Sequence, residues 1–327
     1  MMRWLFLRSA HKGGALTSPP PVQILDPHAD MWTGLFAEIV RQVRGEGQVR
    51  VLGKPIEVFG SNVVIRRAPD FTSRMEKPDV IFNRGGYADY LPALHAWPDA
   101  VRVYYGAGKR YCPADGVPYH IILTDTHAQR EEVAEKHPES RVAVFHKPAA
   151  KCFVPVDAEK RFDVVFVCHT AAEFKGHHWL IERLPRGCRV LRIGTPDPWF
   201  AAANDSGRLV VTFTGNIRPD EIPAWACQAL VGVVCDDGTA DSGPRILPEY
   251  LAMNIPVVVR DTVRADFDAY IASETGLVGD DRSFADRLEE VLGDWPARSP
   301  RRYYEEHLSM KHAAARVVGL VDERRGT

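Results

Sequence analysis

The sequence predicts an α/β protein of two domains, each a parallel β-sheet flanked by helices. The chain has 327 residues, more than one core usually holds and enough for two domains of about 150 residues. Short apolar runs alternate with helical patterns, and this alternation pauses only once, near residues 151–161. Strands that alternate with helices form βαβ units, whose strands lie parallel in one sheet.

The first series of strands and helices runs from residue 3 to residue 145. An amphipathic helix is expected over 31–43, where Leu35, Phe36, Ile39 and Val40 recur at helical spacing, and Gly45 and Gly47 end it. A short helix is expected at 91–97, and a polar helix capped by Thr124 or Asp125 runs to Lys136. The expected strands are 3–7, 63–65, 80–82, 101–105, 121–123 and 142–145.

The second series begins after a linker at 153–157. Its expected strands are 163–167, 189–194, 209–213, 229–234 and 255–259, and its expected helices are 179–184, 222–227, 248–253, 284–292 and 303–321. We therefore expect Rossmann-like domains at 1–153 and 154–302, and a C-terminal helix within 303–327 that can pack back on the N-terminal domain. Open α/β sheets bind ligands beyond the carboxyl ends of their strands, so the cleft between the domains is the expected site.

Composition and missing motifs exclude several classes of function. The formal net charge of −2 argues against a nucleic-acid-binding protein. The six cysteines form no C-x-x-C pair, which favours free thiols in a reducing compartment and argues against a zinc site. The apolar start is too short for a signal-peptide core, and no run is long enough to span a bilayer, so a cytoplasmic protein is expected. A dinucleotide fingerprint, a P-loop and a nucleophile elbow are all missing from the sequence.

The most informative segment is 235–259, in which an acidic, glycine-containing loop and a short helix separate two buried strands. Pro248 suits the first turn of that helix, Glu249 follows it, and Asn254 can adopt the left-handed conformation at the helix end. Loop amides from Gly243 to Leu247 can hold a diphosphate. Glu249 can then accept hydrogen bonds from ribose hydroxyls, and Asp241 can contact hydroxyls of a sugar.

This segment resembles the acidic E-x7-E motif of glycosyltransferase family 4, with Asp241 in the first acidic place and Glu249 in the second. The first place is usually glutamate. A second resemblance is the strand, loop and Lys175-Gly176 of 164–176, where the arginine that the family carries five residues before the lysine is replaced by Thr170. Gly194 and the turn at 211–217 also match the family pattern. Together the matches cover most of residues 160–280, whereas the N-terminal half matches only in outline.

The resemblance implies a GT-B fold and a retaining transfer of a hexosyl group from a nucleoside-diphosphate sugar, such as a UDP or GDP sugar, to an acceptor hydroxyl. It implies no essential metal and no cofactor beyond the nucleotide-sugar co-substrate. We expect Asp241 and Lys175 to be catalytic. The expected donor-binding residues are Lys175, Gly194, Gly215, Asn216, Ser242, Gly243, Pro244, Arg245, Ile246 and Glu249. The expected acceptor or phosphate loops contain Gly13, Gly14, Lys109 and Arg110.

Three alternatives remain open at this point. Asp241 and Glu249 can be a solvated loop acid and an acid that stabilises a helix start. Thr170 in the arginine position suggests a non-catalytic nucleotide-sugar-binding protein or partner subunit. A DNA-base glycosyltransferase is also compatible with the fold, but the nearly neutral charge disfavours it.

Overall fold

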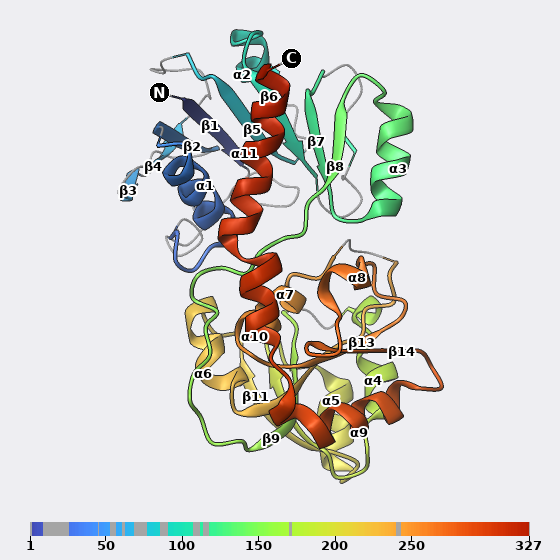
Figure 1. Ribbon diagram of the computed structural model, residues 1–327. Coiled ribbons are helices and arrows are strands. Elements are labelled where there is room, and N and C mark those ends of the chain that lie inside the picture. Colours follow the sequence, from blue (N-terminus) through green and yellow to red (C-terminus); the bar gives the residue numbers. More distant parts are fainter. Residues whose placement is uncertain are drawn as a thin grey trace. The chain divides into compact units, whose positions relative to one another are not determined.

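The computed structural model describes residues 2–8, 26–44, 46–52, 57–60, 63–68, 77–85, 91–106, 112–113, 118–169, 172–239 and 243–326. The chain divides into two compact units. The first unit contains Met1–His146 and Met310–Thr327, and the second contains Lys147–Ser309. Each unit is a sheet with helices packed against it (Figure 1).

The sheet of the first unit has eight strands in the order β3-β4-β2-β1-β5-β6-β7-β8. Neighbouring strands are parallel except β3 and β4, which pair antiparallel. The strands are β1 (Arg3–Arg8), β2 (Glu46–Leu52), β3 (Glu57–Gly60), β4 (Val63–Ala68), β5 (Val80–Arg84), β6 (Val101–Tyr105), β7 (Ile121–Thr124) and β8 (Arg141–Val144). The helices are α1 (Met31–Gln42), α2 (Leu91–Ala96), α3 (His127–Lys136) and α11 (Met310–Gly326).

Aromatic side chains form much of the first core. The rings of Phe6 on β1 and Phe36 on α1 stack with their centroids 4.0 Å apart, and Trp32 lies 4.6 Å from Tyr105 on β6. Helix α1 also contacts α11, where the side-chain amide of Gln42 donates to the Lys311 carbonyl at 2.9 Å. The apolar stripe that predicts α1 is therefore its buried face, as expected for an amphipathic helix.

The sheet of the second unit has six parallel strands in the order β11-β10-β9-β12-β13-β14. Its strands are β9 (Phe162–Val167), β10 (Arg189–Ile193), β11 (Val210–Gly215), β12 (Ala229–Val234), β13 (Val257–Arg260) and β14 (Gly276–Gly279). Its helices are α4 (His177–Arg183), α5 (Pro198–Asp205), α6 (Ile222–Ala226), α7 (Ile246–Ala252), α8 (Phe267–Tyr270), α9 (Phe284–Asp294) and α10 (Pro300–Tyr303), followed by a π-helical turn at Tyr304–Leu308.

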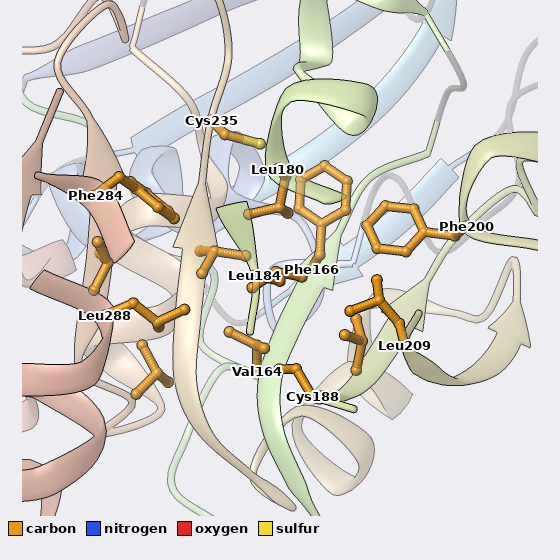
Figure 2. Packing of buried hydrophobic residues seen from close by; sticks show 14 of the residues in the cluster. Val164, Phe166, Leu180, Leu184, Cys188, Phe200, Leu209, Cys235, Phe284 and Leu288 are labelled. Carbon is orange, nitrogen blue, oxygen red and sulfur yellow. The ribbon is translucent and has the colours of Figure 1, made fainter. Parts of the chain in front are cut away.

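The core of this unit lies between the sheet and helices α4, α5 and α9. Val164 and Phe166 of β9 contribute to the cluster together with Leu180, Phe200 and Phe284 from the helices (Figure 2). Two mostly parallel sheets with flanking helices confirm the predicted fold class, whereas the cleft between the domains stays a prediction. Within the described residues, no helix combines the length and apolar character that crossing a bilayer requires.

Several local expectations were wrong. Strands β2 and β3 were not predicted, and Gly47 lies inside β2 rather than ending a helix. The α3 cap is Thr126, whose hydroxyl accepts the Gln129 amide at 3.2 Å, and not Thr124 or Asp125. Helix α7 begins at Ile246 rather than at Pro248, although Pro248 does lie in its first turn as expected. Along the chain, the boundaries of the two units fall at 146/147 and 309/310. The sequence pattern places domain boundaries at 153/154 and 302/303, and those limits stay predictions.

Candidate functional site

The carboxyl ends of four neighbouring strands of the second unit carry the predicted donor-binding segments. Lys175 follows β9, Gly194 follows β10, Gly215 ends β11, and the segment 243–249 follows β12. These four strands are adjacent and parallel, so the segments leave the sheet at one edge. Such an edge is where open α/β sheets bind their ligands. The topology therefore gathers these segments, which are far apart in the sequence.

Lys175 ends a short 3-10 turn, Glu173–Lys175, that is fastened to the end of β12. The Asp237 amide donates to the Phe174 carbonyl at 2.8 Å, and the Cys235 thiol to the Lys175 carbonyl at 3.2 Å. Gly176 follows with φ +71°, and a Cβ there would lie 2.1 Å from the Cys235 carbonyl oxygen. Glycine is therefore required after Lys175 for backbone conformation and for space.

The Lys175 ammonium forms an ion pair that the sequence did not suggest. Its Nζ lies 2.7 Å from Oδ2 of Asp236, and each side chain is 12% exposed. The ammonium also lies 4.9 Å from the centroid of the Phe174 ring. The Thr262 hydroxyl donates to the Asp236 carbonyl at 2.9 Å and fixes the backbone of the acid. An anion that binds Lys175 must therefore share the ammonium with a nearby carboxylate or displace it.

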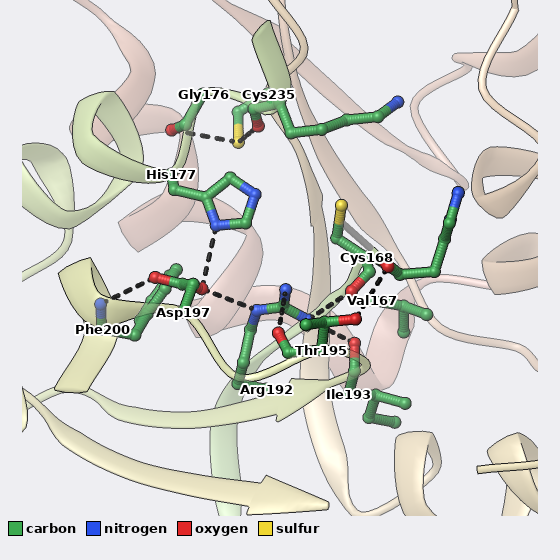
Figure 3. Close-up of polar contacts among 12 residues, drawn as sticks. Val167, Cys168, Gly176, His177, Arg192, Ile193, Thr195, Asp197, Phe200 and Cys235 are labelled. Carbon is green, nitrogen blue, oxygen red and sulfur yellow. Dashed lines mark hydrogen bonds and ion pairs between the residues drawn. The ribbon is translucent and has the colours of Figure 1, made fainter. Parts of the chain in front are cut away.

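The Gly194 turn is built around a fully buried arginine (Figure 3). The Arg192 guanidinium donates to the Cys168 carbonyl at 2.7 Å, to the Thr195 carbonyl at 3.0 Å and to the Ile193 carbonyl. At Gly194 φ is +116°, and a Cβ would lie 1.9 Å from the Cys168 carbonyl oxygen. The glycine thus lets the ends of β9 and β10 approach each other.

A buried acid, Asp197, completes the hydrogen-bond network around Arg192. Asp197 accepts from Arg192 Nε at 3.2 Å and from the Phe200 amide at 3.0 Å, and its carboxylate lies 2.9 Å from Nδ1 of His177 (Figure 3). Burial is the largest single effect and opposes protonation of His177, but the hydrogen bonds and charges of Asp197 and Cys168 together outweigh it and raise the imidazole pKa. His177 therefore belongs to the same buried hydrogen-bond network as Arg192 and Asp197. Sequence reasoning did not single out Arg192 or Asp197, and the only signal was an arginine inside an apolar strand.

Gly215 and Asn216 lie beside the Gly194 turn. The Gly194 amide donates to the Gly215 carbonyl at 3.0 Å, and Gly215 has φ +71°. The Asn216 side-chain amide donates to the Thr195 hydroxyl at 3.2 Å. The structure thus joins two of the predicted donor-binding segments directly. Their contact with a nucleotide stays a prediction.

Glu249 lies in the first turn of α7 and is half-buried. Burial raises the pKa of its carboxyl group to about 7, although the positive charges of Arg245 and Lys147 lower it. Tyr250 anchors the same helix to β9, because its hydroxyl accepts the Val167 amide at 3.0 Å and donates to the Val165 carbonyl at 3.1 Å. Glu249 is thus held on a rigid element and titrates close to neutral pH.

The loop before α7 has an unexpected partner, Lys147. This lysine is 6% exposed, and its Nζ donates to the Gly243 carbonyl at 2.8 Å. The amide of Gly243 donates to the Arg264 carbonyl at 2.7 Å, and the Leu247 amide to the Pro244 carbonyl at 3.2 Å. Pro244 has no N–H, so this stretch can offer a phosphate at most the amides of Arg245 and Ile246. The sequence predicts that the amides from Gly243 to Leu247 hold a diphosphate, and the structure reduces that set to these two amides.

The structure describes nine of the predicted site residues, namely Lys175, Gly194, Gly215, Asn216, Gly243, Pro244, Arg245, Ile246 and Glu249. All nine belong to segments at or next to the same edge of the second sheet. Asp241, Ser242, Gly13, Gly14, Lys109 and Arg110 lie outside the described residues, as does Thr170. In the part of the chain that the structure describes, no three His, Cys, Asp or Glu side chains gather as ligands for a metal ion.

Comparison with known proteins identifies the second unit and the fold. Residues 161–294 match the family model described as glycosyl transferases group 1. No curated protein matches this chain in sequence. A sucrose-phosphate synthase from Thermosynechococcus elongatus is similar in structure with a TM-score of 0.68 at 14% identity, over 100% of both chains. A glycosyltransferase from Rickettsia africae ESF-5 gives 0.70 at 11% identity, over 98% of both chains.

A third similar structure is Anabaena HepE in complex with UDP and glucose, with a TM-score of 0.65 at 12% identity, over 99% of this chain and 100% of that one. At such identities the structural likeness establishes the fold, and the family match covers residues 161–294 of the second unit. The chain therefore has the GT-B fold, and its second unit is similar to the group 1 glycosyltransferases.

Proposed function

We propose that the chain transfers a hexosyl group from a nucleoside-diphosphate sugar to an acceptor hydroxyl, with retention at the anomeric carbon and without an essential metal. The observation that carries the proposal is that Lys175, the turns at Gly194 and Gly215, and Glu249 all lie at one edge of the second sheet. HepE, which shares this fold, was crystallised with UDP and glucose, and this supports a UDP sugar as the first donor to test.

The charges at this edge suit a leaving diphosphate. A nucleoside diphosphate must be stabilised as negative charge develops on it, and a positioned ammonium supplies that stabilisation. Lys175 is the ammonium we assign to this role, with the amides of Arg245 and Ile246 as further hydrogen-bond donors. Helix α7 has seven residues, so its dipole adds little. Asp241 would orient the sugar, and the first unit would supply the acceptor pocket.

Glu249 would hold the ribose of the donor. A carboxylate accepts hydrogen bonds from two neighbouring hydroxyls, but a protonated carboxyl group loses part of this capacity. With a pKa raised to about 7 by burial, Glu249 binds ribose best above neutral pH. Donor binding should therefore strengthen as the pH rises through 7.

Thermal-shift measurements with UDP, GDP and dTDP, each with and without an attached sugar, test donor binding. A ligand at 100 times its Kd stabilises the protein by about 2.7 kcal/mol, which raises Tm by about 5–10 °C for units of this size. We expect one nucleotide to give such a shift, and Glu249→Gln to abolish most of it. Glu290→Gln is the matched control, because Glu290 is exposed on α9 far along the chain from the loop segments. No shift with any nucleotide would refute the proposal.

One observation favours a second candidate, a nucleotide-sugar-binding protein without transferase activity. Lys175 already shares its charge with Asp236, and position 170 carries threonine instead of arginine. Assays of hydrolysis and of transfer to a panel of acceptors separate the candidates. Slow hydrolysis of the bound donor, which needs no acceptor, supports the enzyme, whereas tight binding without hydrolysis or transfer supports the second candidate.

A further inference from the structure

Lys147 is a buried lysine that neither the family resemblance nor the predicted site includes. It lies in the extended segment that follows β8, a stretch without helix or strand. This segment is well anchored: the Ala149 amide donates to the Tyr304 hydroxyl at 3.2 Å, and Ala149, Ala150 and Phe153 are buried. Burying an ammonium group is costly unless charged or polar groups compensate it. The surroundings of Lys147 should therefore show what its charge does.

The first compensating group is the Gly243 carbonyl, which accepts from Lys147 Nζ at 2.8 Å. Gly243 has φ +44° and begins the part of the loop that the structure describes before α7. The hydrogen bond therefore ties the segment after β8 to the loop whose Arg245 and Ile246 amides we assign to the proposed diphosphate. A side chain that holds this carbonyl also limits where the neighbouring amides can point.

The second compensating group is the Glu249 carboxylate. Arg245, the N-cap residue of the same helix, and Lys147 are the positive charges that stabilise its ionised form, against the effect of burial. Among the described residues, further groups near this helix include Tyr304, whose hydroxyl pKa burial raises to about 12, and Arg301, whose guanidinium donates to the Ala252 carbonyl at 2.7 Å. Arg245 is exposed, so solvent screens its charge, whereas the buried ammonium of Lys147 is screened much less. Glu249 therefore has two positive neighbours, the exposed Arg245 with the larger effect on its pKa and the buried Lys147 with the smaller one.

We propose that Lys147 is a positioning residue of the donor site, which holds the Gly243 carbonyl in place and keeps a positive charge beside the Glu249 carboxylate. This inference rests on the proposed function, because it assigns Lys147 to the same site. Lys147 acts through the loop and through Glu249, and its own contact with the nucleotide is not required. It adds a cation to a site in which Lys175 is already paired with an acid.

The test compares the wild type with Lys147→Gln and Lys147→Arg. Glutamine keeps much of the length and can donate to the Gly243 carbonyl but has no charge, whereas arginine keeps the charge. Lys136→Gln is the matched control, since Lys136 is an exposed lysine on α3 of the first unit. Far-UV circular dichroism and thermal unfolding verify that each variant is folded before it is measured.

The primary measurement needs no ligand. In protein labelled with [δ-13C]glutamate, NMR follows the titration of Glu249, whose signal is assigned by its loss in Glu249→Gln. We expect a midpoint near pH 7 in the wild type, about one pH unit higher in Lys147→Gln, and near the wild-type value in Lys147→Arg. A shift of one unit lowers the ionised fraction at pH 7 about fivefold.

Calorimetric titration with UDP and with GDP gives the second measurement. For the nucleotide that binds, we expect Lys147→Gln to raise Kd about fivefold at pH 7 and to move the pH dependence upward by the same unit, and Lys147→Arg to restore both. In the Glu249→Gln background, Lys147→Gln should no longer change the pH dependence.

The outcomes separate the two hypotheses. If the wild type binds a nucleotide but Lys147→Gln leaves the Glu249 midpoint and the Kd unchanged, the inference is overturned and the proposed function stands. If Glu249 shifts as expected but no nucleotide binds at any pH, the proposed function fails, and the donor-site role of Lys147 fails with it. Should both glutamine and arginine impair binding equally with an unmoved midpoint, Lys147 has only a packing role.

Discussion

Replacing Asp236 by asparagine changes the charge that a diphosphate meets at Lys175. The two groups lie 2.7 Å apart, and each side chain is 12% exposed. Asparagine has almost the same shape, and its side-chain oxygen can still accept from the lysine, so the lysine keeps its position. What disappears is a negative charge close to the expected diphosphate. Like charges about 4 Å apart repel by up to about 4 kcal/mol in a protein-like dielectric, although solvent and relaxation reduce the net effect.

We expect Asp236→Asn to bind UDP about tenfold more tightly than the wild type, equivalent to about 1.4 kcal/mol. The variant should also lose about 1–3 kcal/mol of folding stability, since the pair is largely buried and a charge-assisted hydrogen bond becomes a neutral one. Calorimetric titration at two salt concentrations measures Kd, and thermal unfolding measures stability. The gain in affinity should shrink at high salt if it is electrostatic.

The chain offers a matched control, the pair of Lys77 and Asp99. Its atoms also lie 2.7 Å apart, but its side chains are 61% and 74% exposed. Asp99→Asn should change stability by less than about 1 kcal/mol and leave UDP binding unaltered. Weaker UDP binding by Asp236→Asn would refute this reasoning, because it would mean that the carboxylate is needed to hold Lys175 toward the nucleotide.

Three further predictions concern Glu249, the buried Arg192 and Gly176. The raised pKa of Glu249 means that the folded state holds a proton more tightly than the unfolded chain, so the free energy of unfolding falls as pH rises from about 4.5 to about 7. Glu249→Gln should remove about 2–3 kcal/mol of this loss, which is measured as a higher Tm than the wild type at pH 8 but not at pH 4. The control Glu290→Gln should leave the pH dependence of Tm unchanged. Arg192→Met should destabilise the second unit by about 3–5 kcal/mol in denaturant unfolding, since it leaves the buried Asp197 without one partner. A loss below about 1 kcal/mol would contradict a stabilising role for the hydrogen-bond network of Arg192 and Asp197. Gly176→Ala should cost more than about 2 kcal/mol and weaken UDP binding at least tenfold, because a Cβ would meet the Cys235 carbonyl; unchanged binding would show that the Lys175 turn is not used.

Local patterns predicted most of the framework. The strands that became β5 to β13 and the buried stripe of α1 follow from side-chain periodicity, which depends only on neighbouring residues. Asn254 has φ +59° at the end of α7, as expected for a residue that tolerates the left-handed conformation. Strands β2 and β3 were missed, since their glycines and charged residues weaken the apolar alternation that marks a strand.

Periodicity and motif spacing are local properties, and they predict the fold class and the order of the donor-binding segments along the chain. Which charged and polar groups lie next to each other depends on the folding of the whole chain. Lys175 finds Asp236 61 residues away, and Lys147 finds Gly243 96 residues away. Strand order brings Lys175 and Asp236 together, because β9 and β12 are neighbours and their order is set by packing over the whole sheet rather than by any short stretch of sequence. Lys147 lies outside that sheet, and it reaches Gly243 because the segment after β8 lies against the loop before α7.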